Sequence, residues 1–408
     1  MATATLTPQP VPMATESEYK PFQSAPTILE EVKAQQERLR ERLAGALINP
    51  PPGTSADSLP TVPLIDIGPS FDGNLASRQA VAAQIRQACV TTGFFQITNH
   101  GVLEQARAGV LEQAARFFHE LSEDQKQALH IRNSPLFRGY EPHDATFVNT
   151  DDQNGVQKET KEGFNWGYER DLDPTGGDGK YVELDGTSPQ TTGLGNLWPS
   201  SEDLPGFYEK ISDYYGQVLQ LARHLFRLFA LSLDLEEDYF DASTTHPGGI
   251  ARLLYYPGQP APENESSEAA LEAASKLGLG AHTDYECFTI LLSSSNPGLE
   301  ILFPPSPATD NRPIWRPCPV VPGSFTINVA DFFQRWTNGL YKSTIHRVVS
   351  KPGTGERYSV PFFFSINYDS DVLPLPERCV GKSRFLPLKA GEYVLERLRA
   401  TQLLEATT

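Results

Sequence analysis

Two side chains that commonly bind metal ions are separated by a single residue in the tripeptide His282-Thr283-Asp284. On a β-strand, residues two apart project from the same face, which would place this imidazole beside this carboxylate. The tripeptide alone is weak evidence, because a single histidine near a strand end is more often structural. His346 is the best candidate for a third ligand, since a lone histidine is unusual in a β-branched run. Two histidines and one carboxylate on one face form a triad that holds Fe(II) and leaves other coordination positions open.

An arginine and a serine follow this predicted metal centre along the chain. Arg357 and Ser359 also alternate on a predicted strand, directly before the apolar residues 360–364. A guanidinium and a hydroxyl on one face can together bind a carboxylate at the bottom of an apolar barrel. The alternative is that Arg357 pairs with an acidic side chain of the protein and that Ser359 is incidental. Their order and spacing after the metal residues favour carboxylate binding.

After Ala251 the sequence consists of short apolar runs separated by Pro and Gly. Such spacing favours a sandwich or barrel over a parallel sheet. The strands are predicted at residues 253–256, 288–292, 299–303, 324–329, 344–349 and 360–366. Residues 262–276 are acidic and rich in Ser and Ala, which indicates a solvated loop, and a helix over 391–404 closes the chain.

The N-terminal half has a different pattern. Residues 1–26 predict a flexible tail. Thr27 and Glu30 have the form of a capping box and begin a peripheral helix that extends to Ile48. A strand, helix and strand at 62–67, 76–91 and 93–97 are followed by long helices at 103–121 and 206–233.

Composition narrows the functional classes. The formal net charge of −17 argues against nucleic-acid binding, which needs a basic face. Four widely spaced cysteines without a CxxC pair fit free thiols in a reducing compartment, and we expect a cytoplasmic protein. Neither a signal peptide nor a membrane span is predicted.

Over residues 60–398 the chain resembles the iron(II)- and 2-oxoglutarate-dependent dioxygenases, in the branch related to isopenicillin N synthase and the plant flavonoid and gibberellin oxygenases. The motifs occur in the order typical of that family. They are residues 62–67, 92–102, 137–140, 161–164, 282–291, 328–331, 335–339, 342–348 and 357–363.

The resemblance implies a mainly β fold with flanking helices and a double-stranded β-helix core, which is a cupin-like jelly roll. Residues 1–58 would form the tail and peripheral helix, and residues 59–404 one dioxygenase domain. Within that domain we expect a mostly helical part at 59–250, the jelly roll with the metal site at 251–390, and the closing helix at 391–404.

The resemblance also implies roles for individual residues. His282, Asp284 and His346 would bind iron, Arg357 and Ser359 the distal carboxylate of 2-oxoglutarate, and Tyr256 would touch that carboxylate. Leu254 departs from the family, which frequently has Asn there. Asp331 would form hydrogen bonds near a tight turn, and Cys287 would belong to the core. The aromatic residues Phe164, Trp166, Phe362 and Phe364 are interpreted as core rather than as substrate contacts.

The implied activity is oxidation of a small, largely apolar organic molecule, by hydroxylation, desaturation or ring rearrangement, in specialised metabolism. Fe(II), 2-oxoglutarate and O2 would be required, with ascorbate as a candidate reductant, and succinate and CO2 would be released. One alternative is an oxidase of the same fold that uses O2 without 2-oxoglutarate, in which Arg357 and Ser359 hold the carboxylate of the substrate. A remote alternative is a binding protein without catalysis.

Overall fold

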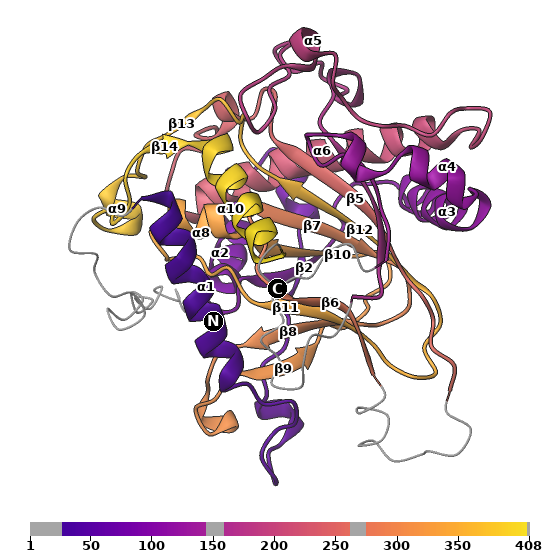
Figure 1. Cartoon of the computed structure of the whole chain (residues 1–408). Helices are drawn as coiled ribbons and strands as arrows, with labels where there is room; N and C mark the ends of the chain where they lie inside the picture. Colours follow the sequence, from indigo (N-terminus) through magenta and orange to yellow (C-terminus); the bar gives the residue numbers. More distant parts are fainter. Residues whose placement is uncertain (1–26, 144–158, 262–274, 406–408) are drawn as a thin grey trace.

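The computed structural model describes residues 27–143, 159–261 and 275–405, so the predicted tail and almost all of the predicted 262–276 loop lie outside the described residues. Two facing sheets form its centre (Figure 1). The large sheet has the strand order β1-β2-β10-β7-β12-β5-β4-β3, and the small sheet the order β6-β11-β8-β9. A two-stranded sheet pairs β13 (Asp371–Val372) with β14 (Leu388–Lys389).

The strands of the large sheet are β1 (Leu64–Asp66), β2 (Phe94–Thr98), β3 (Gly139–Glu141), β4 (Glu162–Gly167), β5 (Gly249–Tyr256), β7 (Phe288–Ser293), β10 (Phe325–Val329) and β12 (Arg357–Phe364). Those of the small sheet are β6 (Lys276–His282), β8 (Leu299–Phe303), β9 (Ile314–Pro317) and β11 (His346–Ser350). Within these sheets only β1 and β2 pair in parallel, and they are joined through a helix as the sequence predicts. The jelly-roll expectation is confirmed.

The described α-helices are α1 (Ile28–Ala44), α2 (Leu75–Thr91), α3 (Glu104–Glu120), α4 (Glu123–Ala128), α5 (Pro189–Thr192), α6 (Phe207–Ser232), α8 (Asp331–Trp336), α9 (Glu377–Val380) and α10 (Ala390–Glu405). Helices α2, α3 and α6 cover the outer face of the large sheet: α2 contacts β1 and β2, α3 contacts β5 and β12, and aromatic side chains of α6 pack on β12. The buried face of α6 contacts α2 and α3. None of the described helices is both long enough and apolar enough to cross a bilayer.

Strand β12 shows how one apolar run serves two environments. Phe362 and Phe364 face the helices, where their rings lie 5.1 Å from Tyr215 and 5.6 Å from Phe226, measured between centroids. The alternate residues Arg357 and Phe363 line the space between the sheets. Period-two alternation therefore separates core residues from cavity residues along a strand that is buried on both faces.

Helix α1 begins as predicted, but the prediction that it extends to Ile48 is wrong. The Thr27–Glu30 capping box is present, and the helix ends at Ala44, before Gly45. Beyond that point Leu47 forms a β-bridge with Ile314 of β9, because pairing with the sheet edge satisfies its backbone groups better than another helical turn would.

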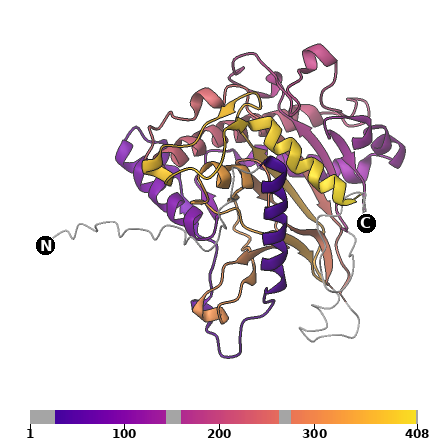
Figure 2. The same ribbon diagram turned by 60° about the vertical axis from the view of Figure 1, so that its left-hand side comes forward.

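Within helix α1, Glu31 and Val32 are the buried residues. Figure 2 shows the helix crossing close to α10. Glu31 is 7% exposed and forms a buried ion pair with Arg335 of α8, with Nε 2.6 Å from Oε2. The N-terminal helix is thus fixed to the body of the fold by charge as well as by apolar contact.

Gly93 allows two distant segments to approach. Its φ angle is +68°, and an added Cβ atom would lie 1.9 Å from the carbonyl oxygen of Lys342. Two residues after Lys342, the hydroxyl of Thr344 donates a 2.6 Å hydrogen bond to the Thr92 carbonyl. This contact sets the path of the chain immediately before His346.

We expect Gly93→Ala to lower the free energy of unfolding by about 3 kcal/mol, because backbone strain and a collision with the Lys342 carbonyl act together. Gly53→Ala is the matched control: its φ is +84°, but nothing lies within 4 Å of the added atom, so only the strain of about 1 kcal/mol applies. Denaturant unfolding followed by circular dichroism measures both. Equal losses would contradict the role given to the Lys342 contact.

Candidate active site

The space between the two sheets is a cavity of about 230 Å³. Side chains from both sheets line it, from β5, β7, β10 and β12 on one side and β6, β8 and β11 on the other. All six site residues named from the sequence border this cavity: Tyr256, His282, Asp284, His346, Arg357 and Ser359. Residues far apart in the sequence therefore line one cavity.

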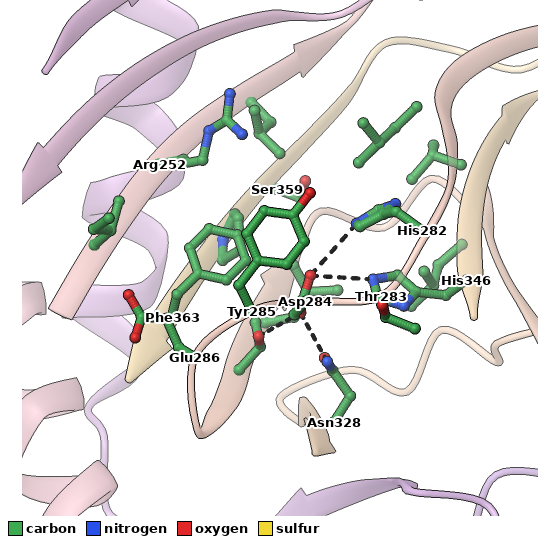
Figure 3. Close-up of a pocket in the computed structure, with 18 of the residues that line it drawn as sticks. Arg252, His282, Thr283, Asp284, Tyr285, Glu286, Asn328, His346, Ser359 and Phe363 are labelled. Carbon is green, nitrogen blue, oxygen red and sulfur yellow. Dashed lines mark hydrogen bonds and ion pairs between the residues drawn. The ribbon is translucent and has the colours of Figure 1, made fainter. Parts of the chain in front are cut away.

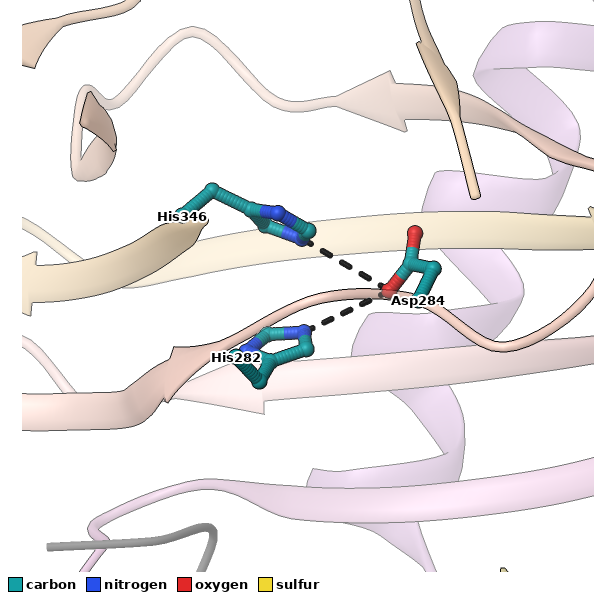
Figure 4. Close-up of side chains that lie close together, drawn as sticks. All are labelled: His282, Asp284 and His346. Carbon is teal, nitrogen blue, oxygen red and sulfur yellow. Dashed lines mark ion pairs between the residues drawn. The ribbon is translucent and has the colours of Figure 1, made fainter. Parts of the chain in front are cut away.

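Three of them form a compact cluster at one wall (Figure 4). Nε2 of His282 lies 3.4 Å from Oδ1 of Asp284, and Nε2 of His346 lies 3.6 Å from the same oxygen. One ligand atom from each residue lies within 4.8 Å of the others, and this is the only such group of three found among the described residues. The histidines are paired directly across β6 and β11.

Asp284 does not lie on a strand. Strand β6 ends at His282, and Asp284 belongs to the turn that leads into β7. The alternation expected from the sequence therefore does not place its carboxylate, although the predicted proximity is present. The turn places Oδ1 near both imidazoles.

Backbone carbonyls orient both imidazole rings. Nδ1 of His282 lies 2.8 Å from the Gly280 carbonyl oxygen, and Nδ1 of His346 lies 3.1 Å from that of Thr344. A carbonyl oxygen only accepts hydrogen bonds, so each Nδ1 carries the proton. In the neutral form of each ring, Nε2 then carries the lone pair and faces Asp284, which is the tautomer a metal ligand needs.

The second oxygen of Asp284 is held separately. Oδ2 accepts a 2.5 Å hydrogen bond from the Thr289 hydroxyl. It also accepts one of 2.7 Å from the Asn328 amide (Figure 3). Thr289 lies on β7 and Asn328 on β10, so the large sheet fixes the orientation of this carboxylate. Sequence reasoning did not assign a role to either residue, because their relation to Asp284 exists only across the strand pairing.

Burial and charge oppose each other in the cluster. Burial tends to raise the pKa of Asp284, but the adjacent His346 and His282 and the hydrogen bond from Thr289 lower it below its ordinary value. Burial, followed by repulsion from His282, lowers the pKa of His346 to about 4. A neutral His346 and an ionised Asp284 at neutral pH fit a divalent cation, and two nitrogens with one carboxylate oxygen match the Fe(II) facial triad.

A buried arginine lies on the large sheet farther along the cavity. Arg357 is 4% exposed; Nη1 donates a 3.2 Å hydrogen bond to the Ser359 hydroxyl, and Nη2 a 3.0 Å hydrogen bond to that of Ser293. The guanidinium carbon lies 5.0 Å from the ring centroid of Tyr256, the residue paired with it on β5. Burial lowers the pKa of Arg357.

Within the described part of the chain, no carboxylate lies within ion-pair distance of Arg357. The alternative that it pairs with a protein acid therefore has no support there. A buried cation whose neighbours are hydroxyls and a tyrosine ring is suited to an incoming carboxylate. Leu254 also lines this part of the cavity and provides no polar group.

The opposite part of the cavity is bordered by aromatic and apolar side chains. They include Phe137, Ile250, Tyr285, Phe363, Val394 and Leu398. Of the aromatic residues considered from the sequence, Phe164, Trp166, Phe362 and Phe364 all lie in the main core, as interpreted. Phe363 was missed, although the alternation of β12 distinguishes it from its neighbours.

Several polar side chains complete the lining. Arg252 donates a 2.7 Å hydrogen bond from Nε to Asn165 and pairs with Glu141. Glu286 accepts a hydrogen bond from the Tyr368 hydroxyl at 2.8 Å, and burial raises its pKa to about 7. Cys287 is a buried core residue, as predicted.

Two family models match the chain. Residues 62–199 match the model described as the N-terminal part of a non-haem dioxygenase in morphine synthesis, and residues 247–366 match the 2OG-Fe(II) oxygenase superfamily. The second match contains the cluster of His282, Asp284 and His346 and the pair of Arg357 and Ser359.

Curated relatives extend the similarity to most of the chain. A 2-oxoglutarate-Fe(II) type oxidoreductase, hxnY, of Emericella nidulans is 36% identical over 333 residues, covering 81% of this chain and 84% of the relative. A 2-oxoglutarate-dependent dioxygenase of Didymella fabae is 34% identical over 346 residues, covering 83% and 96%.

Among solved structures, full-length Neurospora crassa T7H in complex with alpha-KG and thymine has a TM-score of 0.66 and 25% identity, over 83% of this chain and 97% of that one. JOX2 in complex with 2OG, Fe and JA has a TM-score of 0.59 and 24% identity, over 88% and 92%. At this level of identity the second likeness shows the fold.

We expect Asn328→Ala to weaken Fe(II) binding by about 10- to 100-fold, because Oδ2 of Asp284 loses its amide donor and the carboxylate can rotate. Anaerobic Fe(II) titration of the purified protein measures this. Thr326→Ala is the control: Thr326 lies on the same strand and face, but it contacts Gln96 and Cys318 instead of Asp284. Equal weakening in both variants would indicate a general effect on β10.

Proposed function

The chain belongs to the 2OG-Fe(II) oxygenase superfamily, and we propose that its reaction takes place in the cavity between the two sheets, with His282, Asp284 and His346 as the iron ligands. The protein is an Fe(II)- and 2-oxoglutarate-dependent dioxygenase that uses O2 as co-substrate. The observation that carries the site assignment is the convergence of two Nε2 atoms and one carboxylate oxygen within 4.8 Å.

Fe(II), when bound there, supplies the oxidative chemistry in which 2-oxoglutarate and O2 are consumed and succinate and CO2 are released. The protein contributes orientation. Gly280 and Thr344 fix the tautomers of the two histidines through their carbonyl groups, while Thr289 and Asn328 hold Asp284 ionised and correctly turned. Three protein ligands on one face leave the remaining positions available to small molecules.

We propose that Arg357, Ser359 and Tyr256 bind the distal carboxylate of 2-oxoglutarate. The support is a buried guanidinium in the same cavity as the metal cluster, held by two hydroxyls and stacked on a tyrosine. An apolar Leu254 beside them means that this end of the co-substrate depends on the arginine and its hydroxyl neighbours.

The other part of the cavity suggests the class of substrate. Its apolar and aromatic lining supports a small, largely apolar organic molecule, and Arg252 provides polar contact at that end. The similar T7H structure holds thymine, which is also a small organic molecule. The match to a model from morphine synthesis supports a role in specialised metabolism.

We further propose that residues 59–404 act as one domain, because strands β1–β4 complete the sheet formed by β5, β7, β10 and β12. Four buried free thiols support a reducing, cytoplasmic location. An oxidase that works without 2-oxoglutarate is not favoured, since the relatives are named as 2-oxoglutarate-dependent enzymes. Catalytic loss is not favoured either, since the metal cluster is intact.

The first test is anaerobic reconstitution with Fe(II) and 2-oxoglutarate. We expect a visible charge-transfer absorption in the wild type and its loss in His282→Ala, because two remaining ligands hold the metal weakly. His119→Ala is the matched control, since His119 is exposed and contacts Glu356 and Tyr358 away from the cluster. An unchanged spectrum in His282→Ala would contradict the assignment. A metabolite screen for succinate release, with ascorbate present, would then identify the substrate.

We expect Arg357→Met to raise the KM for 2-oxoglutarate about 100-fold, which corresponds to about 3 kcal/mol for a lost charge-assisted contact. Ser359→Ala should cost about 1 kcal/mol, or about fivefold. Fe(II) affinity without 2-oxoglutarate should stay at the wild-type value in both variants. Steady-state succinate formation and Fe(II) titration separate the two effects. Turnover that needs no 2-oxoglutarate would overturn the co-substrate assignment.

A further inference from the structure

The C-terminal helix α10 forms part of the active-site cavity. Val394 and Leu398 line the cavity. On the helix, Val394 lies three residues before Arg397 and four before Leu398. Residues three and four apart share a helix face, so the three side chains act as one surface. The helix therefore presents a charged residue and two apolar residues to the interior of the fold.

Arg397 reaches Asp331 at the start of α8. Its Nη2 donates a 2.6 Å hydrogen bond to Oδ2 of Asp331, and the two side chains are 7% and 0% exposed. The same oxygen accepts a 2.9 Å hydrogen bond from the hydroxyl of Thr283, which lies between the two ligands His282 and Asp284. A single carboxylate oxygen thus joins the C-terminal helix to the metal-binding segment.

The backbone of α8 holds the same segment. The amide of Asp331 donates a 2.9 Å hydrogen bond to the carbonyl of Asp284, and the amide of Phe332 donates one of 3.2 Å to the carbonyl of Tyr285. The position of α8 therefore fixes the backbone at Asp284, and with it the direction in which the Asp284 side chain points. A side-chain bond and backbone bonds act on three consecutive residues.

Arg397 makes a second contact with this segment. Its guanidinium carbon lies 4.6 Å from the ring centroid of Tyr285, which lines the cavity beside the metal cluster (Figure 3). It also donates a 3.2 Å hydrogen bond to Gln35 of α1. The Arg397 side chain therefore contacts α1, the Tyr285 ring and Asp331.

A buried ion pair of this kind needs both partners. Removing the arginine alone leaves the Asp331 carboxylate uncompensated in the interior, which is costly, whereas replacing both charges together is often tolerated. Replacing Arg397 alone should therefore lower the stability more than replacing Arg397 and Asp331 together. Comparing the two variants separates a loss of stability from an effect on the metal centre.

We propose that Arg397 is a positioning residue for the metal centre, which fixes residues Thr283 to Tyr285 through Asp331 and through the Tyr285 ring. The inference rests on the proposed function, because it assumes that Asp284 is an iron ligand. It makes the C-terminal helix a component of the active site rather than a cover over it.

The test compares Arg397→Met, Arg397→Lys, Asp331→Asn and the double variant Asp331→Asn/Arg397→Met. Arg399→Met is the matched control, since Arg399 lies on the same helix, is exposed and pairs only locally with Glu396. The readouts are the Kd for Fe(II), the charge-transfer absorption with 2-oxoglutarate and the Tm. Binding is measured well below the Tm of every variant.

We expect Arg397→Met to raise the Kd for Fe(II) at least about tenfold and to shift the absorption band, as losses of supporting contacts to metal ligands do. Arg397→Lys should recover part of the affinity, because it keeps the charge beside Asp331. The double variant should recover Tm relative to Arg397→Met but not the Kd, since the link to Thr283 and Tyr285 is still missing. Arg399→Met should behave as wild type.

A wild-type Kd and spectrum in Arg397→Met, with only a lower Tm, would show a purely structural role and overturn the proposal. If Arg397→Met does not fold, the double variant decides: wild-type Fe(II) affinity there would also overturn it. Failure of the wild type and of Arg399→Met to bind Fe(II) would instead reject the proposed function.

Discussion

The arrangement depends on keeping one buried carboxylate ionised in the wall of the cavity. Asp284 is buried, yet its Oδ2 accepts hydrogen bonds from Thr289 and Asn328 while Oδ1 faces two imidazoles. Without those partners a buried carboxylate would take up a proton, and the neutral group would bind a metal ion only weakly. The pairing of β7 with β10 and the turn after β6 have to be in place before any metal chemistry is possible.

The two sheets contribute different chemical groups to the cavity. The small sheet supplies both histidines, from paired positions on β6 and β11. The large sheet supplies Arg357, Ser359 and Tyr256, together with the two donors to Asp284. Aromatic packing of α6 against the outer face of the large sheet makes that wall stiff. The packing of the two sheets therefore sets the separation between the paired histidines and Arg357.

Short helix α8 connects both ends of the chain to the site. Arg335 at its end pairs with Glu31 of α1, and Asp331 at its start pairs with Arg397 of α10. Buried ion pairs contribute little net stability, because desolvation offsets attraction, but they strongly disfavour misplaced arrangements. Two such pairs of opposite polarity on this six-residue helix define where α1 and α10 dock relative to the end of β10, which carries Asn328 and is followed by α8.

The sequence by itself determined the fold class, most element positions and six of the residues that line the cavity, because alternation, capping and family motifs are local signals. It did not determine that Asp284 lies beyond its strand, that Asn328 and Thr289 hold it, or that Phe363 rather than Phe362 faces the cavity. It also gave Arg397 no role. Thr289 is five residues from Asp284, Asn328 is 44 residues from it, and Arg397 is 66 residues from Asp331. Each of these contacts forms only when strands pair in register or helices dock.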